Sequence, residues 1–141
     1  MDRRELLAGL GITAMAAGTA GAFAQHEHHG VEGGPQQPLI KAASACSNAA
    51  ELCLTHCLAA LAAGDKSLQA CAATSREVAT VCTALRSLAA QNAPHLAAYA
   101  KVAAEICKAC EAECRKHPQH ATCTSCADTC AACAAECEKT V

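Results

Sequence analysis

Large side chains are scarce in this chain of 141 residues, which has no Trp, one Tyr, one Phe and two Met. A small domain normally fills its core with bulky apolar groups at close to crystal density. The many alanines are too small to do this alone. The formal net charge is −2, so no basic excess indicates a nucleic-acid partner. Another kind of side chain therefore has to fill the core.

The first 24 residues have the three-part pattern of an export signal. Arg3 and Arg4 precede a short, weakly apolar run, and an Ala-x-Ala cleavage pattern ends at Ala24. The paired arginines favour the twin-arginine route, which carries folded proteins. A membrane anchor is disfavoured because the run is short and rich in Gly, Ala and Thr. We therefore expect an exported, periplasmic protein whose mature chain, from residue 25, keeps every cysteine.

Residues 25–38 are rich in Gly, Pro, His and Gln, which predicts a flexible leader. His26, His28 and His29 in this leader could bind a metal ion loosely, although a solvent-exposed tail is the simpler interpretation.

From residue 39 onward the chain is rich in alanine, the strongest helix former. Breaks at Gly64-Asp65, at residues 91–94 and at His117-Pro118 predict four helices, over about 39–63, 66–90, 95–116 and 119–139. Short connections make neighbouring helices antiparallel. We therefore predict an all-α, up-down-up-down antiparallel four-helix bundle over residues 39–141.

Every one of the 13 cysteines falls on a single stripe of its predicted helix. Because an α-helix turns about 100° per residue, the cysteines of the first helix lie within about 40° of one another. The five of the last helix, at gaps of three and four, span about 80°. Charged residues fall on the opposite faces, so the bundle should turn its thiols inward. The candidate metal ligands are Cys46, Cys53, Cys57, Cys71, Cys82, Cys107, Cys110, Cys114, Cys123, Cys126, Cys130, Cys133 and Cys137.

Several roles for these cysteines can be compared. One or two cysteines in a core act as small hydrophobic residues, but 13 on aligned stripes do not. A disulfide-stabilised structural protein remains an alternative for an exported chain. The odd number and the poor disulfide geometry of cysteines three or four apart on one helix count against it. A thiol redox enzyme normally has one C-x2-C motif in a βαβ fold, so we expect no enzyme.

Metal binding by thiolates fits the pattern better. Soft thiolate ligands select Cu(I), Zn(II) or iron–sulfur clusters. Four thiolates around one Zn(II) leave a negative charge, and an iron–sulfur cluster needs an isolated set of about four cysteines. About one Cu(I) per thiolate gives a neutral core, which a dry interior tolerates. The pattern therefore favours many Cu(I) ions, with a general Zn(II) buffer as an alternative.

The two ends of the predicted bundle differ. The antiparallel order brings His56 together with Cys57, Cys71, Cys114 and Cys123, so we expect copper to enter there, with His56 as a further ligand. His117 and His120 on the adjacent loop, and His95 at the other end, are expected to be solvent-exposed. An apolar plug is predicted at that other end from Leu39, Leu85, Leu88, Leu96 and Tyr99.

The segments "CSNAAELCLTHC", "CAATSREVATVC", "EICKACEAEC" and "CTSCADTCAACAAEC" resemble those of the bacterial copper storage proteins, a family of cysteine-lined four-helix bundles. The resemblance runs from Cys46 to Cys137 and implies storage of many Cu(I) ions, a homotetramer, and exchange with copper donor or acceptor proteins. The export signal is similar to that of the exported branch, and His56 matches the family's mouth histidine. Exported members can carry methionines near the mouth, where this chain has Ala60, Ala63 and Leu68.

Overall fold

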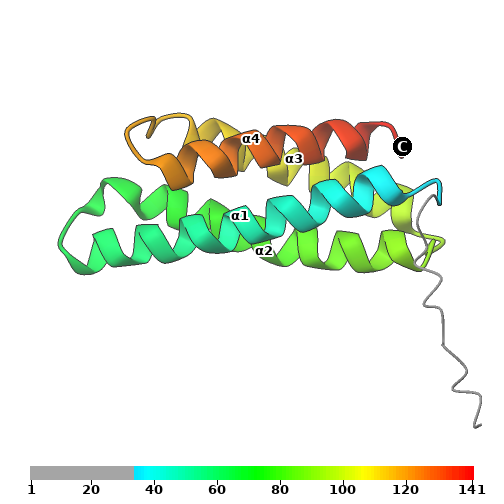
Figure 1. Cartoon of the computed structure of the whole chain (residues 1–141), viewed down its shortest axis with the longest axis horizontal. Helices are drawn as coiled ribbons and strands as arrows, with labels where there is room; N and C mark the ends of the chain where they lie inside the picture. Colours follow the sequence, from blue (N-terminus) through cyan, green and yellow to red (C-terminus); the bar gives the residue numbers. More distant parts are fainter. Residues whose placement is uncertain (1–33) are drawn as a thin grey trace, which may run out of the picture. The chain divides into compact units, whose positions relative to one another are not determined.

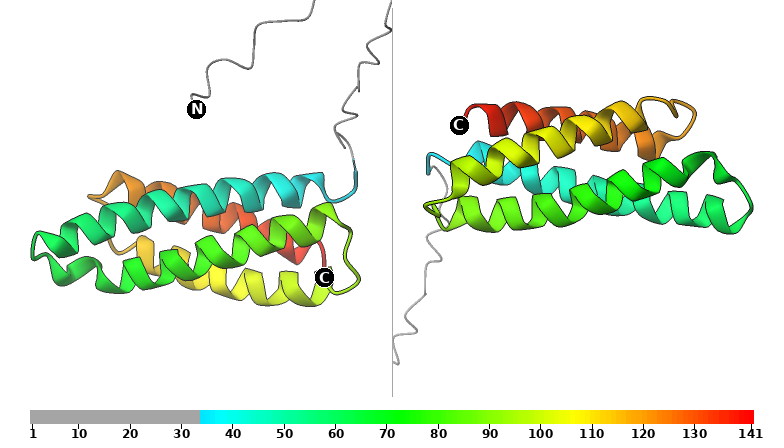
Figure 2. Two further views of the ribbon diagram at one scale, coloured as in Figure 1. Left: turned by 90° about the horizontal axis from the view of Figure 1, so that it is seen from below. Right: turned by 180° about the vertical axis from the view of Figure 1, so that it is seen from behind.

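The computed structural model describes residues 34–141, which form four α-helices (Figure 1). Helix α1 packs against α2 and α4, and α3 packs against the same two helices, so the four make an antiparallel bundle (Figure 2). The predicted all-α bundle is confirmed. The helices are α1 (Gln37–Ala62), α2 (Gln69–Ala90), α3 (Leu96–Cys114) and α4 (Ala121–Glu138). The predicted export signal and residues 25–33 of the predicted leader lie outside the described residues.

The helix ends differ from the predicted ones by a few residues. Helix α1 begins at Gln37, two residues early, with Pro38 in its first turn, where a missing N–H breaks no hydrogen bond. The last two residues of the predicted leader therefore belong to α1. Helix α3 ends at Cys114 and α4 begins at Ala121, so their connection is longer than expected. A single 3₁₀ turn, η1 (Lys66–Leu68), precedes α2.

The turn after α1 has a Schellman arrangement. Gly64, at φ 93°, donates its backbone N–H to the carbonyl of Leu61 at 3.0 Å, and Asp65 donates to that of Ala60 at 3.0 Å. Asp65 then caps η1, because its side chain accepts a hydrogen bond from the backbone N–H of Ser67. The predicted break at Gly64-Asp65 is thus confirmed, and it turns α2 back along α1.

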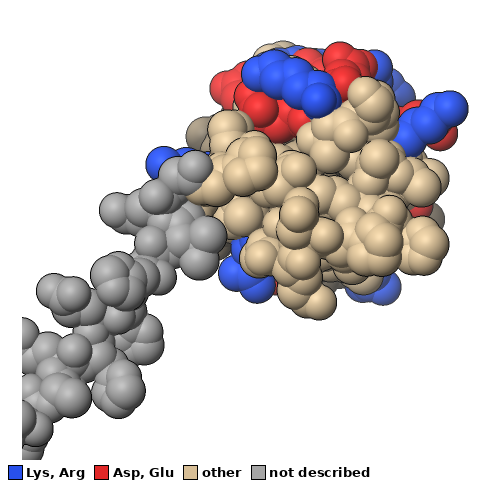
Figure 3. Space-filling view, turned by 90° about the vertical axis from the view of Figure 1, so that its right-hand side faces the viewer, with Lys and Arg blue, Asp and Glu red and all other residues tan. Residues whose placement is uncertain are grey.

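The core of the bundle is made of sulfur and methyl groups. All thirteen cysteines are buried, and the largest fully buried carbon side chains are Leu68, Leu85 and Val78. Ion pairs such as Arg115–Asp128 lie on the surface. Figure 3 shows the end of the bundle opposite His56, where uncharged side chains cover most of the face and charged side chains lie around its edges, most densely at the top. The prediction that thiols point inward and charges outward is confirmed.

Helix α1 has an unusual surface for a bundle helix. Its buried stripe faces the other helices, but Leu52 and Leu58 on its outer side are 58% and 44% exposed. Among the described helices, α1 alone is long and apolar enough to cross a membrane by length and composition. Its packing against α2 and α4 shows that it is a structural member of the bundle.

Candidate metal centre

The mouth of the bundle is the end where α1 and α3 finish and α2 and α4 begin. Four thiols meet there and form what we name the mouth tetrad, Cys53, Cys57, Cys71 and Cys123, whose sulfur atoms all lie within 4.8 Å of one another. The Cys53 sulfur is 3.9 Å from that of Cys57, 3.6 Å from that of Cys71 and 3.7 Å from that of Cys123. Cys57, Cys71 and Cys123 meet here as predicted, whereas Cys53 holds the place expected for Cys114, whose sulfur lies 3.4 Å from that of Cys71.

Two groups of three thiols continue inward from the mouth tetrad. Cys53, Cys114 and Cys126 form one triad, and Cys110, Cys126 and Cys130 form the next. Cys53 belongs both to the mouth tetrad and to the first triad, and Cys126 belongs to both triads. Because neighbouring groups share a thiol, one sulfur can bridge two metal ions along this path.

A second four-thiol group lies deeper in the bundle. This deep tetrad consists of Cys46, Cys82, Cys107 and Cys133, again with all sulfur atoms within 4.8 Å of one another. The Cys46 sulfur is 3.6 Å from that of Cys130, which joins the deep tetrad to the second triad. Cys137 is buried one turn beyond Cys133 on α4. The thiols therefore form one continuous path along the bundle.

The far end of this path is closed by carbon side chains. Leu39, Leu85 and Leu96 are buried there, with Leu88 packed against them. Tyr99 is partly buried and donates its hydroxyl to the backbone carbonyl of Val81 at 3.3 Å. The predicted apolar plug is confirmed. The thiols are therefore closed off at this end, which leaves the mouth as the end for metal entry.

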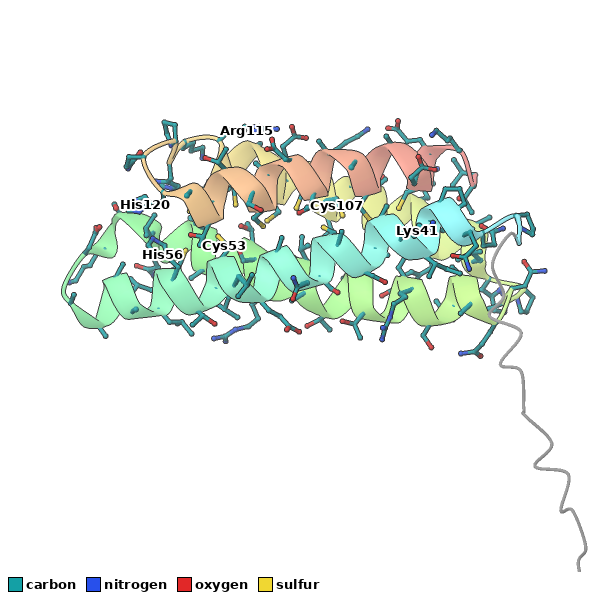
Figure 4. The ribbon with its side chains drawn as sticks, in the orientation of Figure 1. Lys41, Cys53, His56, Cys107, Arg115 and His120 are labelled. Carbon is teal, nitrogen blue, oxygen red and sulfur yellow. The ribbon has the colours of Figure 1, made fainter. Side chains whose placement is uncertain are left out.

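Three histidines surround the mouth. The Nε2 of His56 and the Nδ1 of His120 are 2.9 Å apart and share a hydrogen bond, and Figure 4 shows both rings beside Cys53. His117 is only 9% exposed, and its Nε2 lies 3.5 Å from the carboxylate of Glu113. The expectation that His117 is solvent-exposed is therefore wrong, and His120 is half-buried against His56. His95 is exposed, as expected.

Sequence reasoning overlooked Ser75. Its side chain is fully buried on the cysteine-bearing face of α2, and its hydroxyl faces Cys53, whose pKa it helps to lower. Ser75 lies one helical turn from Cys71, so its position on the stripe was the signal that could have revealed it. A hydroxyl among thiols can donate to a thiolate that forms next to it.

Each tetrad contains thiols of opposite acidity. Hydrogen bonds from Cys114, Cys126 and Cys71 lower the pKa of Cys53, whereas burial raises the pKa values of Cys57 and Cys123. In the deep tetrad, hydrogen bonds from Cys107 and Cys130 lower the pKa of Cys46 to about 5, and hydrogen bonds also lower the pKa of Cys133. The thiols with lowered pKa values therefore ionise first, while their neighbours keep their protons until a cation replaces them.

A comparison with known families decides what kind of protein has this core. The model of the family described as copper storage protein matches residues 34–141, which include all thirteen cysteines. The chain belongs to the copper storage protein family. Membership of this family confirms the resemblance seen in the cysteine motifs, while the exported branch stays a prediction.

The chain is similar to proteins of Bacillus subtilis. An uncharacterized cysteine-rich protein, YhjQ, is 33% identical over 88 residues, which are 62% of this chain and 79% of the relative. The apo structure of copper storage protein 3 has a TM-score of 0.67 and 30% identity, covering 74% of this chain and 97% of that one. Cu(I)-bound copper storage protein 3 has a TM-score of 0.65 and 30% identity, covering 72% and 93% of the two chains.

Proposed function

We propose that this protein is a non-catalytic store for Cu(I) that holds about one ion per cysteine. The observation that carries the proposal is the continuous path of buried thiols, in which neighbouring groups share Cys53 and Cys126. Sulfur atoms 3.4–3.9 Å apart, as between Cys71 and Cys114 or Cys110 and Cys114, suit cations held by two or three thiolates each. A solved relative carries the description Cu(I)-bound.

Charge explains why such a path favours monovalent copper. Within residues 34–141 no lysine or arginine is buried, so thiolates formed in the core must be neutralised by the metal itself. One Cu(I) per thiolate achieves this with the cysteines alone. The arrangement disfavours the disulfide-stabilised alternative, because a sulfur such as that of Cys53 faces three other thiols at 3.6–3.9 Å and has no single partner.

The test is an anaerobic Cu(I) titration of the reduced mature chain, residues 25–141, against a chromogenic competing ligand. We expect tight binding to end near thirteen Cu(I) per chain, one per cysteine. An end point at only a few ions would contradict storage. A parallel Zn(II) titration is the control, because a general soft-metal buffer would take up both metals equally.

We also propose that the store works outside the cytoplasm. The support is the pattern of Arg3, Arg4 and the Ala-x-Ala site before residue 25. Replacing both arginines by lysine should leave the full-length precursor in the cytoplasm, whereas the unchanged chain should appear in the periplasm at mature length. Equal fractionation of both would contradict the twin-arginine route.

A homotetramer is the assembly that we propose, by resemblance to the family. The exposed leucines on α1, Leu52 and Leu58, support a contact through this helix. Light scattering on the purified mature chain should give four times the mass of one chain, and Leu52→Glu should lower it. Copper donor and acceptor proteins are proposed as further partners, and they would have to reach the thiols at the mouth.

A further inference from the structure

The mouth and deep tetrads differ from the triads in offering four mutually adjacent thiols. A tetrahedral cation with metal–sulfur bonds of about 2.3 Å needs sulfur atoms about 3.8 Å apart. In the mouth tetrad, the Cys53 sulfur lies 3.6–3.9 Å from the other three, Cys71 and Cys123 are 3.6 Å apart, and the remaining two pairs lie within 4.8 Å. The sulfur atoms therefore already have nearly the spacing of a closed four-thiolate site.

Charge is the obstacle to a divalent cation in such a site, because four thiolates around it leave two negative charges. The mouth tetrad has a means of offsetting them. Cys71 is the third residue of α2 and Cys123 the third residue of α4. First-turn N–H groups and the helix dipole stabilise negative charge at these positions. Helix α4 has no side-chain cap and no acidic residue in its first turn, so its field is available to Cys123, whereas Asp65 already caps η1 directly before α2.

The histidines add to this effect. His56 precedes Cys57 on α1, and its ring is hydrogen-bonded to His120, the residue before α4. The mouth tetrad is therefore bordered by polar groups that can donate hydrogen bonds toward a negatively charged centre.

The deep tetrad lacks these features. Cys46, Cys82, Cys107 and Cys133 all lie more than two turns from the N-terminus of their helices. Their surroundings are alanines, other thiols and the apolar plug. A centre with two negative charges would be unfavourable there, although the sulfur spacing is similar.

We propose that the mouth tetrad is a distinct site for a divalent cation of the Zn(II) class, bound by the thiolates of Cys53, Cys57, Cys71 and Cys123. The deep tetrad binds Cu(I) only. This role goes beyond copper storage, because the divalent cation binds to the mouth tetrad in protein that holds no copper. A cation there ties α1 to α2 and α4 at the mouth, and Cu(I), the softer cation, replaces it during loading.

Cobalt(II) is the probe, since it adopts tetrahedral thiolate sites and gives visible bands that Zn(II) lacks. Added to the reduced mature chain under anaerobic conditions, it should give tetrahedral thiolate bands that saturate at one ion per chain. Zn(II) should bleach these bands. X-ray absorption at the zinc edge of the unchanged protein should show four sulfur ligands at about 2.3 Å.

Two matched variants locate the site. Cys71→Ser removes a thiol of the mouth tetrad and should abolish the bands, whereas Cys82→Ser removes a thiol of the deep tetrad and should leave them. Equal loss in both variants, two equivalent sites, or zinc with fewer than four sulfur ligands would overturn the proposal. The absorption measurement needs no variant, so a misfolded variant does not prevent the test.

A Cu(I) titration of the same preparations separates this inference from the storage function. If Cu(I) binding ends near one ion per cysteine while cobalt finds no site, the mouth proposal fails and storage stands. If cobalt binds as expected while Cu(I) stops at a few ions, storage fails and the divalent site stands.

Discussion

His56 is the residue that most directly connects the surface with the thiols. It is half-buried, its ring is bonded to His120, and the next residue is Cys57 of the mouth tetrad. The opposite end is closed by Leu39, Leu85 and Leu96. A copper ion entering or leaving the bundle would therefore pass the two histidines.

Replacing His56 should change rates and not capacity. We expect His56→Ala to slow both Cu(I) uptake and its removal by a strong chelator several-fold, because a transient ligand at the mouth is lost. The end point should stay near one ion per cysteine. Stopped-flow absorbance of the copper–thiolate bands measures both rates. His95→Ala, at the plugged end, is the matched control, and equal rates in the two variants would remove His56 from the pathway.

The buried thiols should make the empty protein sensitive to alkaline pH. Burial raises the pKa values of Cys57 and Cys123 in the folded state, so the unfolded chain loses these protons first. Their contribution to stability is complete below about pH 8.5 and declines as the pH rises toward the folded-state values. Each thiol then lowers the free energy of unfolding by at most about 1.4 kcal/mol per pH unit.

This decline can be measured by denaturant unfolding of the reduced, empty protein at about pH 8, 9 and 10. Cys46 and Cys53 have lowered pKa values and contribute no slope above about pH 9, because they are ionised in both states there. The copper-loaded protein is the control, since its thiols have already lost their protons. A free energy of unfolding that stays constant over this range would contradict the prediction.

At the scale of the helix, the stripe of α2 contains one polar interruption. Cys71, Ser75, Val78, Cys82 and Leu85 are all buried on it, and the Ser75 hydroxyl faces the Cys53 thiol, whose pKa it helps to lower. A thiol at position 75 would face the same neighbour. The position is therefore suited to another thiol.

We expect Ser75→Cys to raise the Cu(I) end point by one ion per chain without loss of thermal stability. The added sulfur would lie one turn from Cys71, within the existing path. Competitive Cu(I) titration measures the gain. Ser87→Cys is the matched control on the same helix, because Ser87 is exposed and its new thiol would lie outside the core. An unchanged end point for Ser75→Cys would mean that the face of α2 is not continuous with the store.

The helical pattern predicted much of this arrangement and missed particular parts of it. The 3-4 spacing of Cys123 to Cys137 depends only on the helical period, so it predicted the buried face of α4 correctly. The grouping into tetrads and triads depends on how far each helix slides along its neighbours, which periodicity does not contain. His117 was misjudged because helical periodicity does not describe the loop before α4. In that loop the backbone N–H of His120 donates to the His117 carbonyl, and the His117 side chain is buried.

At the scale of the whole molecule, bound copper should stabilise the folded bundle. A core of thiols and alanines buries little large apolar surface, so the empty bundle gains less from the hydrophobic effect than a leucine-rich one. A ligand that binds only the folded state adds about 2.7 kcal/mol per site at a hundredfold excess over its Kd.

We therefore expect copper to raise the Tm of the reduced protein by at least about 10 °C. Circular dichroism at matched protein concentration measures this shift. A variant with Cys126→Ser, which removes the thiol shared by both triads, is the comparison and should gain less. Equal melting of the empty and loaded protein would contradict binding inside the bundle.

The burial of every thiol has one more consequence, for how a partner could sense the contents of the store. Where a Cu(I) ion replaces a thiol proton, one positive charge replaces another, so only thiols with lowered pKa values, such as Cys46 and Cys53, change the charge of the chain on loading at pH 7. The isoelectric points of the empty and the filled protein should therefore differ by far less than thirteen added charges would require. A receiving protein would have to recognise a full molecule mainly by the histidines and thiols at the mouth, because its electrostatic field at a distance changes little with what it holds.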